Sequence, residues 1–167
     1  MFSWFFDLFR QSRTIIFSRS AQCTLSTARA VLTDAQSLID LNPRVIHRVQ
    51  SKSDPSLWTI VYSMEVLWHT FRFSYTARVT AVNENGMEFV VNAPLGTSLR
   101  TKWEVEEESE REGTVTIVEV VTANASPLFM PLTLRDLVPI HKALQDQLVA
   151  ILEGRADNKV LAEIATS

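Results

Sequence analysis

Histidine and tyrosine side chains at a few positions of this 167-residue sequence could perform proton-transfer chemistry. His69 and Tyr75 lie in one segment of alternating polarity, and His141 lies in a segment with helical spacing. An imidazole titrates near neutral pH and can remove a proton next to a carbonyl group, while a phenol, from Tyr75 or Tyr62, can stabilise the enolate oxygen. The catalytic candidates are therefore His69, Tyr75 and His141, with either histidine as the base.

The segment that carries the first two candidates alternates between apolar and polar residues from Trp68 to Val82. Such alternation predicts a β-strand with one covered and one solvated face, and Phe71 and Phe73 share the covered face with the candidates. Similar alternation, interrupted by turn residues, extends over residues 44–125. It predicts about six antiparallel strands joined by short loops.

A further strand and two helical regions complete the predicted element order. The strand spans Thr14 to Gln22, and helical spacing over residues 26–41 follows it, with Ser26 and Asp34 as candidate caps. This region is either one bent helix or two short ones.

The strongest helical pattern lies near the C-terminus and ends at Gly154. Thr133 and Asp136 form a capping-box-like start, but Pro139 would then remove a hydrogen bond from the second turn. The helix is therefore expected to begin at Asp136 or to be kinked at the proline.

This element order predicts an α+β fold in which a curved antiparallel sheet of about seven strands wraps around the long C-terminal helix. Local marks accompany it: Leu41-Asn-Pro43 before the second strand, Thr101-Lys-Trp103-Glu in the sixth, and Gly113-Thr in the seventh. In this order and these marks, residues 14–153 resemble the START-like superfamily, also called SRPBCC or Bet v 1-like, with its helix-grip fold. The resemblance is greatest to small single-domain members, described as polyketide cyclase-like or as fungal proteins without an assigned role. It implies an internal cavity between sheet and helix.

Polar residues on faces that should be covered favour such a cavity independently. A buried polar group without a partner costs about 1–3 kcal/mol, so several on one wall indicate a pocket that holds water or ligand. The alternative is that each finds a backbone partner inside a packed core. For the last strand, apolar on both faces, the inward set is ambiguous. The candidate ligand-binding residues are Tyr62, Phe71, Phe73, Met87, Phe89, Trp103 and Glu119.

Two functions are compatible with this interior. The first is binding of a hydrophobic small molecule, such as a polyketide, terpenoid or lipid, between aromatic walls. The alternative is a cofactor-free cyclase, dehydratase or isomerase of a secondary-metabolite pathway that uses the histidine and tyrosine side chains in the same cavity. A fold that hosts both activities does not decide between them.

Composition excludes several other classes of function. Sixteen basic and 19 acidic residues give a net charge of −3, which is too near neutrality for a general nucleic-acid binder. The nucleotide-binding and common hydrolase motifs are absent, and His47, His69 and His141 lack the paired spacing of metal ligands. We therefore expect no metal and no cofactor. The single cysteine, Cys23, is expected to be a small buried residue rather than a nucleophile.

Two charged or aromatic segments could serve other purposes. An acidic hairpin over residues 104–112 is expected to be a solvated edge, with a basic partner as the alternative. At the N-terminus, an amphipathic aromatic stripe could anchor the protein peripherally at a membrane surface, cover an apolar site, or pack on the domain's own core. Its residues are Phe2, Trp4, Phe5, Phe6 and Phe9.

The chain is accordingly divided into three parts. Residues 1–13 form the aromatic segment, residues 14–154 the helix-grip domain, and residues 155–167 a tail that could hold a short helix. No transmembrane segment or removable leader is evident, so a cytoplasmic protein is expected, with peripheral membrane contact through the aromatic stripe as a further option. The oligomeric state is left open.

Overall fold

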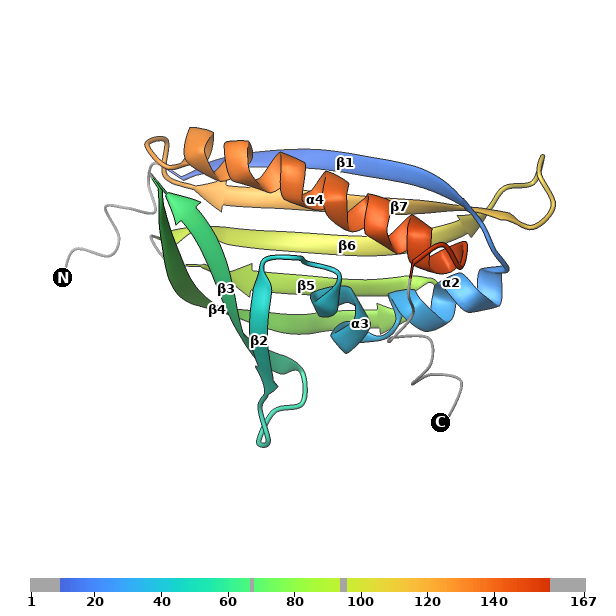
Figure 1. The fold of residues 1–167 in the computed structure, drawn as a ribbon, viewed down its shortest axis with the longest axis horizontal. Helices are drawn as coiled ribbons and strands as arrows, with labels where there is room; N and C mark the ends of the chain where they lie inside the picture. Colours follow the sequence, from blue (N-terminus) through green and yellow to red (C-terminus); the bar gives the residue numbers. More distant parts are fainter. Residues whose placement is uncertain (1–9, 67, 94–95, 157–167) are drawn as a thin grey trace.

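A curved antiparallel sheet wraps around one long helix in the computed structural model, which describes residues 10–66, 68–93 and 96–156 (Figure 1). Its seven strands follow the order β1-β7-β6-β5-β4-β3-β2, and every neighbouring pair is antiparallel. The strands are β1 (Gln11–Gln22), β2 (Val45–Gln50), β3 (Leu57–Val66), β4 (His69–Asn83), β5 (Gly86–Asn92), β6 (Ser98–Glu107) and β7 (Thr114–Ala125). The predicted α+β helix-grip architecture is confirmed. The aromatic N-terminal residues and the predicted tail helix lie outside the described residues.

Strand β1 begins at Gln11, three residues before the predicted Thr14. It pairs with β7 without interruption from Gln11 opposite Ala125 to Gln22 opposite Thr114. The first residues of β1 are polar and exposed because β1 is an edge strand. A prediction based on apolar residues therefore places the start of the strand too late.

Two separate helices follow β1, which settles the alternative left open by the sequence. Helix α2 (Leu25–Leu32) is capped by Thr24, whose hydroxyl accepts a hydrogen bond from the Thr27 amide at 3.2 Å. Helix α3 (Ala35–Asp40) is capped as predicted by Asp34, which accepts from the Ser37 amide at 2.8 Å. The predicted cap at Ser26 is wrong, because Thr24 is the last residue with an extended backbone.

Helix α4 (Met130–Leu152) begins before either predicted start. Its first turn contains Pro131, which has no amide hydrogen to leave unpaired there. The Thr133 hydroxyl is not a cap; it donates to the Phe129 carbonyl at 2.9 Å. Pro139 lies inside the helix on its exposed side, where water can satisfy the carbonyl that the proline leaves without a partner.

The concave face of the sheet is covered unevenly. Helix α4 packs mainly on β1 and β7, while α2 packs on β5, β6 and β7. The main core lies beneath α2 and the C-terminal half of α4, and a smaller one joins Phe17, Val121, Ala123 and Leu137. Between them, the inner faces of β3 to β6 lie opposite the N-terminal half of α4.

A substitution at Gly86, the first residue of β5, tests how closely β5 and β6 approach each other. A Cβ atom there would lie 2.0 Å from the Trp103 carbonyl oxygen, a backbone atom that cannot move aside. We expect Gly86→Ala to lower the free energy of unfolding by about 3 kcal/mol in urea denaturation. The control Gly113→Ala, with no atom within 4 Å of the new Cβ and a positive φ, should cost only about 1 kcal/mol. Equal losses would contradict this explanation.

Candidate ligand-binding cavity

A cavity of about 320 Å³ lies between the inner faces of β3 to β7, helix α3 and the N-terminal half of α4. Its wall is mostly apolar and aromatic. The lining includes Leu132, which is 43% exposed, and we call this side of the cavity its mouth. The strands contribute Ile60, Tyr62, Phe73, Tyr75, Ala77, Phe89, Val91, Leu99, Thr101, Trp103 and Glu119. The helices contribute Leu38, Ile39, Leu132, Thr133, Asp136, Leu137, Ile140, His141 and Leu144.

The most polar part of the wall is a histidine–glutamate pair. His141 Nδ1 lies 2.6 Å from Glu119 Oε1, so a hydrogen bond joins helix α4 to strand β7. Glu119 stands on the inner face of the sheet between Phe17 of β1 and Trp103 of β6, and its side chain is fully buried. The Phe17 ring stacks on the imidazole with centroids 5.7 Å apart, which fixes the ring plane.

Burial raises the pKa of the Glu119 carboxyl, and the neighbouring His141 and Gln145 only partly oppose this effect. The Gln145 side chain is close enough to favour the charged carboxylate, but among the described residues no hydrogen bond of ordinary geometry reaches Glu119 Oε2 or either amide atom of Gln145, although all three atoms are buried. A buried polar atom without a partner costs about 1–3 kcal/mol. This region of the interior is therefore kept polar at the expense of stability.

The protonation of the pair decides what His141 offers to a ligand. When the pair is neutral overall, one proton lies between Oε1 and Nδ1 and a second sits on Nε2, so Nε2 donates a hydrogen bond. When the pair is anionic, Nδ1–H donates to the carboxylate and Nε2 becomes an acceptor and a base. Within the described part of the chain, nothing is hydrogen-bonded to Nε2. The same atom can thus bind a ligand oxygen or accept a proton.

Two phenols share the cavity with this pair. Burial, together with the nearby Tyr62, raises the pKa of Tyr75 to about 12. Burial and the charge of Asp136 also raise the pKa of Tyr62, against the opposing charge of Arg44. Both phenols therefore stay protonated at neutral pH and can donate hydrogen bonds. The two rings meet edge to face with centroids 5.2 Å apart.

The structure brings together most of the candidates predicted from the sequence. Those that line the cavity are Tyr62, Phe73, Tyr75, Phe89, Trp103, Glu119 and His141. Glu119 faces inward because buried residues alternate with half-buried ones along β7, which resolves the ambiguity of that strand.

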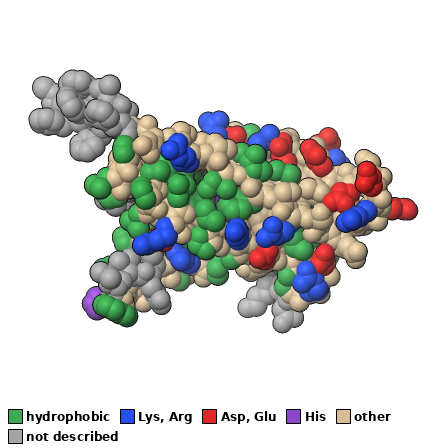
Figure 2. Space-filling view, turned by 90° about the horizontal axis from the view of Figure 1, so that it is seen from above, with side chains coloured by type: hydrophobic (Ala, Val, Ile, Leu, Met, Phe, Trp, Pro, Cys, Tyr) green, Lys and Arg blue, Asp and Glu red, His purple; other side chains and the backbone are tan. Residues whose placement is uncertain are grey.

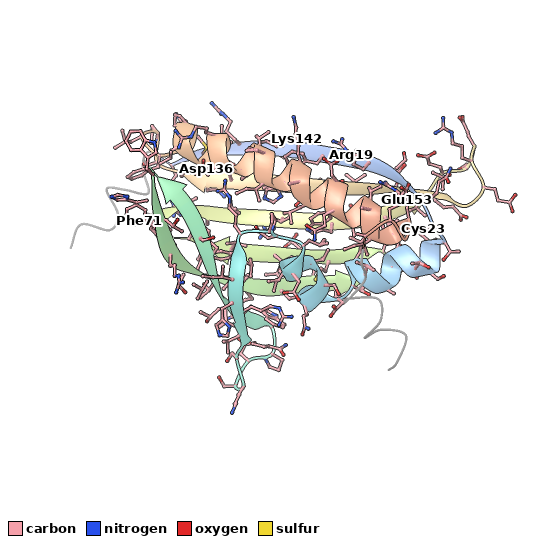
Figure 3. The ribbon with its side chains drawn as sticks, viewed as in Figure 1. Arg19, Cys23, Phe71, Asp136, Lys142 and Glu153 are labelled. Carbon is pink, nitrogen blue, oxygen red and sulfur yellow. The ribbon has the colours of Figure 1, made fainter. Side chains whose placement is uncertain are left out.

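Three candidates lie elsewhere, and their predicted placement in the cavity is corrected. His69 and Phe71 are exposed, because β4 begins beyond the part of the sheet that α4 and α3 cover. Figure 3 shows Phe71 at the end of the molecule where β4 begins. Met87 is buried in the main core near the opposite end of the sheet. Proton transfer in the cavity can therefore use His141 but not His69.

Residues at the mouth of the cavity were not predicted. Arg44 precedes β2, and Asp136 lies in the early turns of α4, on the same wall as Leu132. Asp136 is paired with Arg135 at 3.6 Å. Polar residues beside a loop or helix start are common on protein surfaces, so the sequence carried no specific signal for them.

Other sites of chemistry find no support in the described residues. Within residues 10–66, 68–93 and 96–156, no three histidine, cysteine or acidic side chains are grouped in a way that could hold a metal ion. Cys23 is half-buried, and burial and the charge of Glu153 raise the pKa of its thiol, which disfavours the nucleophilic thiolate. None of the helices described is both long and apolar enough to cross a membrane.

Comparisons with known proteins agree with the fold. Residues 11–154 match the family model of a domain of unknown function, DUF7053. None of the curated proteins matches the sequence. One solved structure with a similar fold is the di-domain aromatase/cyclase StfQ from the steffimycin biosynthetic pathway. Its TM-score is 0.66 at 12% identity over 86% of this chain. The chain spans about half of StfQ, 51% of its length.

Two single-domain structures are similar over nearly their full length. Norcoclaurine synthase from Thalictrum flavum, in complex with dopamine and hydroxybenzaldehyde, gives a TM-score of 0.66 at 11% identity, covering 92% of this chain and 94% of that one. The Zhui aromatase/cyclase from Streptomyces sp. R1128 gives 0.64 at 10% identity, covering 90% and 99%. At these identities the likeness establishes the START-like, Bet v 1-like fold that the sequence suggested.

The raised pKa of the buried Glu119 carboxyl predicts how the free energy of unfolding depends on pH. Because its pKa is raised above the ordinary 4.5, folding takes up a proton, and the free energy of unfolding falls as pH rises from about 4.5 through the raised pKa. Glu119→Gln keeps an oxygen acceptor for His141 but does not titrate. We expect the variant to match the wild type near pH 4 and to be about 1 kcal/mol more stable near pH 8, measured by urea denaturation. A difference that is independent of pH would refute the assignment.

Proposed function

For this chain, which belongs to the DUF7053 family of domains of unknown function, we propose that it binds a flat, largely apolar small molecule in the cavity. The main support for this proposal is an apolar cavity of about 320 Å³ whose wall includes His141, Tyr62 and Tyr75. A hydrogen bond to the buried Glu119 carboxyl holds the His141 imidazole in place. Apolar walls with a few placed polar groups are typical of ligand sites.

The shape and chemistry of the wall favour a particular class of ligand. Phe73, Phe89 and Trp103 provide flat surfaces for aromatic or conjugated rings, and the phenols and the imidazole can bind oxygens on the ligand. A polyketide, a terpenoid or a lipid-like molecule with carbonyl or hydroxyl groups has this combination. Relatives in fold that are aromatase/cyclases, or that hold dopamine and hydroxybenzaldehyde, are compatible with such a ligand.

Filling the cavity from one strand tests ligand binding. Val91 lines the cavity, and Val90 lies on the opposite face of the same strand. We expect Val91→Phe to weaken binding of the fluorescent probe N-phenyl-1-naphthylamine about tenfold, because the new ring occupies the space for the probe. The matched control Val90→Phe should bind as the wild type does. Equal binding by both variants, each shown to be folded by circular dichroism, would rule out the cavity as the site.

A second function, proton transfer without a cofactor, is favoured by the 2.6 Å bond between Glu119 and His141. In the anionic pair, the carboxylate accepts Nδ1–H and leaves the Nε2 lone pair available to remove a proton next to a ligand carbonyl. A protonated phenol from Tyr62 or Tyr75 would then donate a hydrogen bond to the enolate oxygen. Cyclisation, dehydration and isomerisation can all begin with this step.

Deuterium exchange on a model ketone tests proton transfer. In D2O, the protein should accelerate exchange of the acidic α-hydrogens of 2-tetralone, followed by proton NMR, and His141→Gln should reduce the accelerated rate about 100-fold because it removes the base. His69→Gln is the matched control, since His69 is exposed and outside the cavity. A wild-type rate equal to that of buffer, or equal losses in both variants, would eliminate this second function and leave binding.

A further inference from the structure

Exposed apolar side chains lie on two elements at the end of the molecule where the cavity lining includes the exposed Leu132. On one side is the turn between β3 and β4, where Trp68 is 95% exposed and Phe71 is 44% exposed. On the other is the start of α4, where Leu128 is 79% exposed and Leu132 is 43% exposed. We call these four residues the rim. Figure 1 shows that the turn and the start of α4 lie at the same end of the molecule.

Trp68 is held in an unusual backbone conformation. Its φ of 66° is in the left-handed region, which favours glycine and asparagine and strains a bulky side chain. Packing does not compensate for this strain, because the indole is almost fully exposed. A strained residue that projects a large apolar group into solvent is typical of a contact site.

The rim is continuous with the cavity wall. From the turn, aromatic rings follow one another inward: His69 to Phe71 at 6.4 Å, Phe71 to Phe73 at 6.2 Å, and Phe73 to Tyr62 at 5.7 Å between centroids. Phe73 and Tyr62 already line the cavity, as does Leu132 on the opposite side. In Figure 3, Phe71 and the cavity residue Asp136 both lie toward this end.

Charge is distributed unequally between the two ends of the molecule. Exposed arginines lie toward the rim: Arg13 near the start of β1, Arg72 on β4, and Arg135 on α4. The single acidic side chain among the cavity-lining residues at the mouth, Asp136, is paired with Arg135. The opposite end carries the acidic hairpin with Glu106, Glu107, Glu110 and Glu112. Figure 2 shows acidic side chains gathered at that end and hydrophobic ones toward the other.

We propose that the rim docks on an anionic phospholipid surface, with the cavity mouth facing the bilayer. Tryptophan and leucine side chains enter the interface between headgroups and acyl chains, arginines bind anionic headgroups, and the acidic end points away from the negative surface. A two-fold contact through the rim would instead bring this arginine-bearing surface against the same surface of a second copy. Charge complementarity therefore favours the lipid surface.

Sedimentation with phospholipid vesicles tests docking with the full chain. We expect binding to phosphatidylcholine vesicles that contain about 30% phosphatidylserine, and weaker binding at high salt or without the anionic lipid. Trp68→Asn, which also relieves the backbone strain, and Leu128→Ser should each weaken binding about tenfold. The matched control is Val82→Asn, since Val82 is 57% exposed at the far end of β4. It should bind as the wild type does.

Three results would overturn docking by the rim. These are no binding to anionic vesicles, equal binding by the wild type and both rim variants, and an equal loss in Val82→Asn. The second result would assign membrane binding to another part of the chain, such as the aromatic residues 1–9, which every variant retains. Light scattering that shows self-association abolished by Trp68→Asn, without vesicle binding, would instead assign the rim to a second copy. The cavity-filling variant Val91→Phe should still bind vesicles as the wild type does, because the rim is unchanged. Such a result would show that docking does not depend on the proposed ligand site.

Discussion

A single helix of 23 residues covers the concave face of a seven-stranded sheet, and it packs mainly on β1 and β7. One helix is too narrow to fill a sheet that curves this far around it. Helix α2 fills the remaining space at one end, but beneath the N-terminal half of α4 the short helix α3 and α4 itself cover the inward side chains of β3 to β6 only in part. The cavity follows directly from this shortage of covering structure, and its open end follows from the position of α4 relative to the β3–β4 turn.

The same geometry explains why a carboxyl and an imidazole meet inside the protein. Glu119 faces inward with the apolar residues of β7, and His141 is the side chain of α4 that bonds to it. Burial raises the pKa of Glu119, and among the described residues no hydrogen bond of ordinary geometry reaches its second oxygen. An interior built for stability alone would place an apolar side chain there. The cost in stability is understandable if the pair serves a ligand or a reaction.

Much of this arrangement could be predicted from the sequence, and the failures share a cause. Alternation along β4 correctly placed Phe73 and Tyr75 on the covered face, but it could not show that covering structure ends before Phe71 and His69 are reached. Met87 faces inward yet lies in the packed core, because α2 covers that end of the sheet and leaves no space beside it. The polar start of β1 and the start of α4 at Met130 are set by strand pairing and by tertiary packing, which local patterns do not report. The inward orientation of Glu119 could not be predicted from the sequence, because β7 is apolar on both faces.

The proposed site of ligand binding is the cavity beside His141. Nitrogen-15 chemical shifts of the His141 imidazole, measured by NMR with and without N-phenyl-1-naphthylamine, test it most directly, because each ring nitrogen reports its own protonation and hydrogen bonding. We expect Nδ1 to keep the shift of a nitrogen bonded to Glu119, while the Nε2 shift changes as the probe saturates the cavity. If both His141 nitrogens are unaffected while resonances outside the cavity move, the probe binds elsewhere and the cavity is not its site.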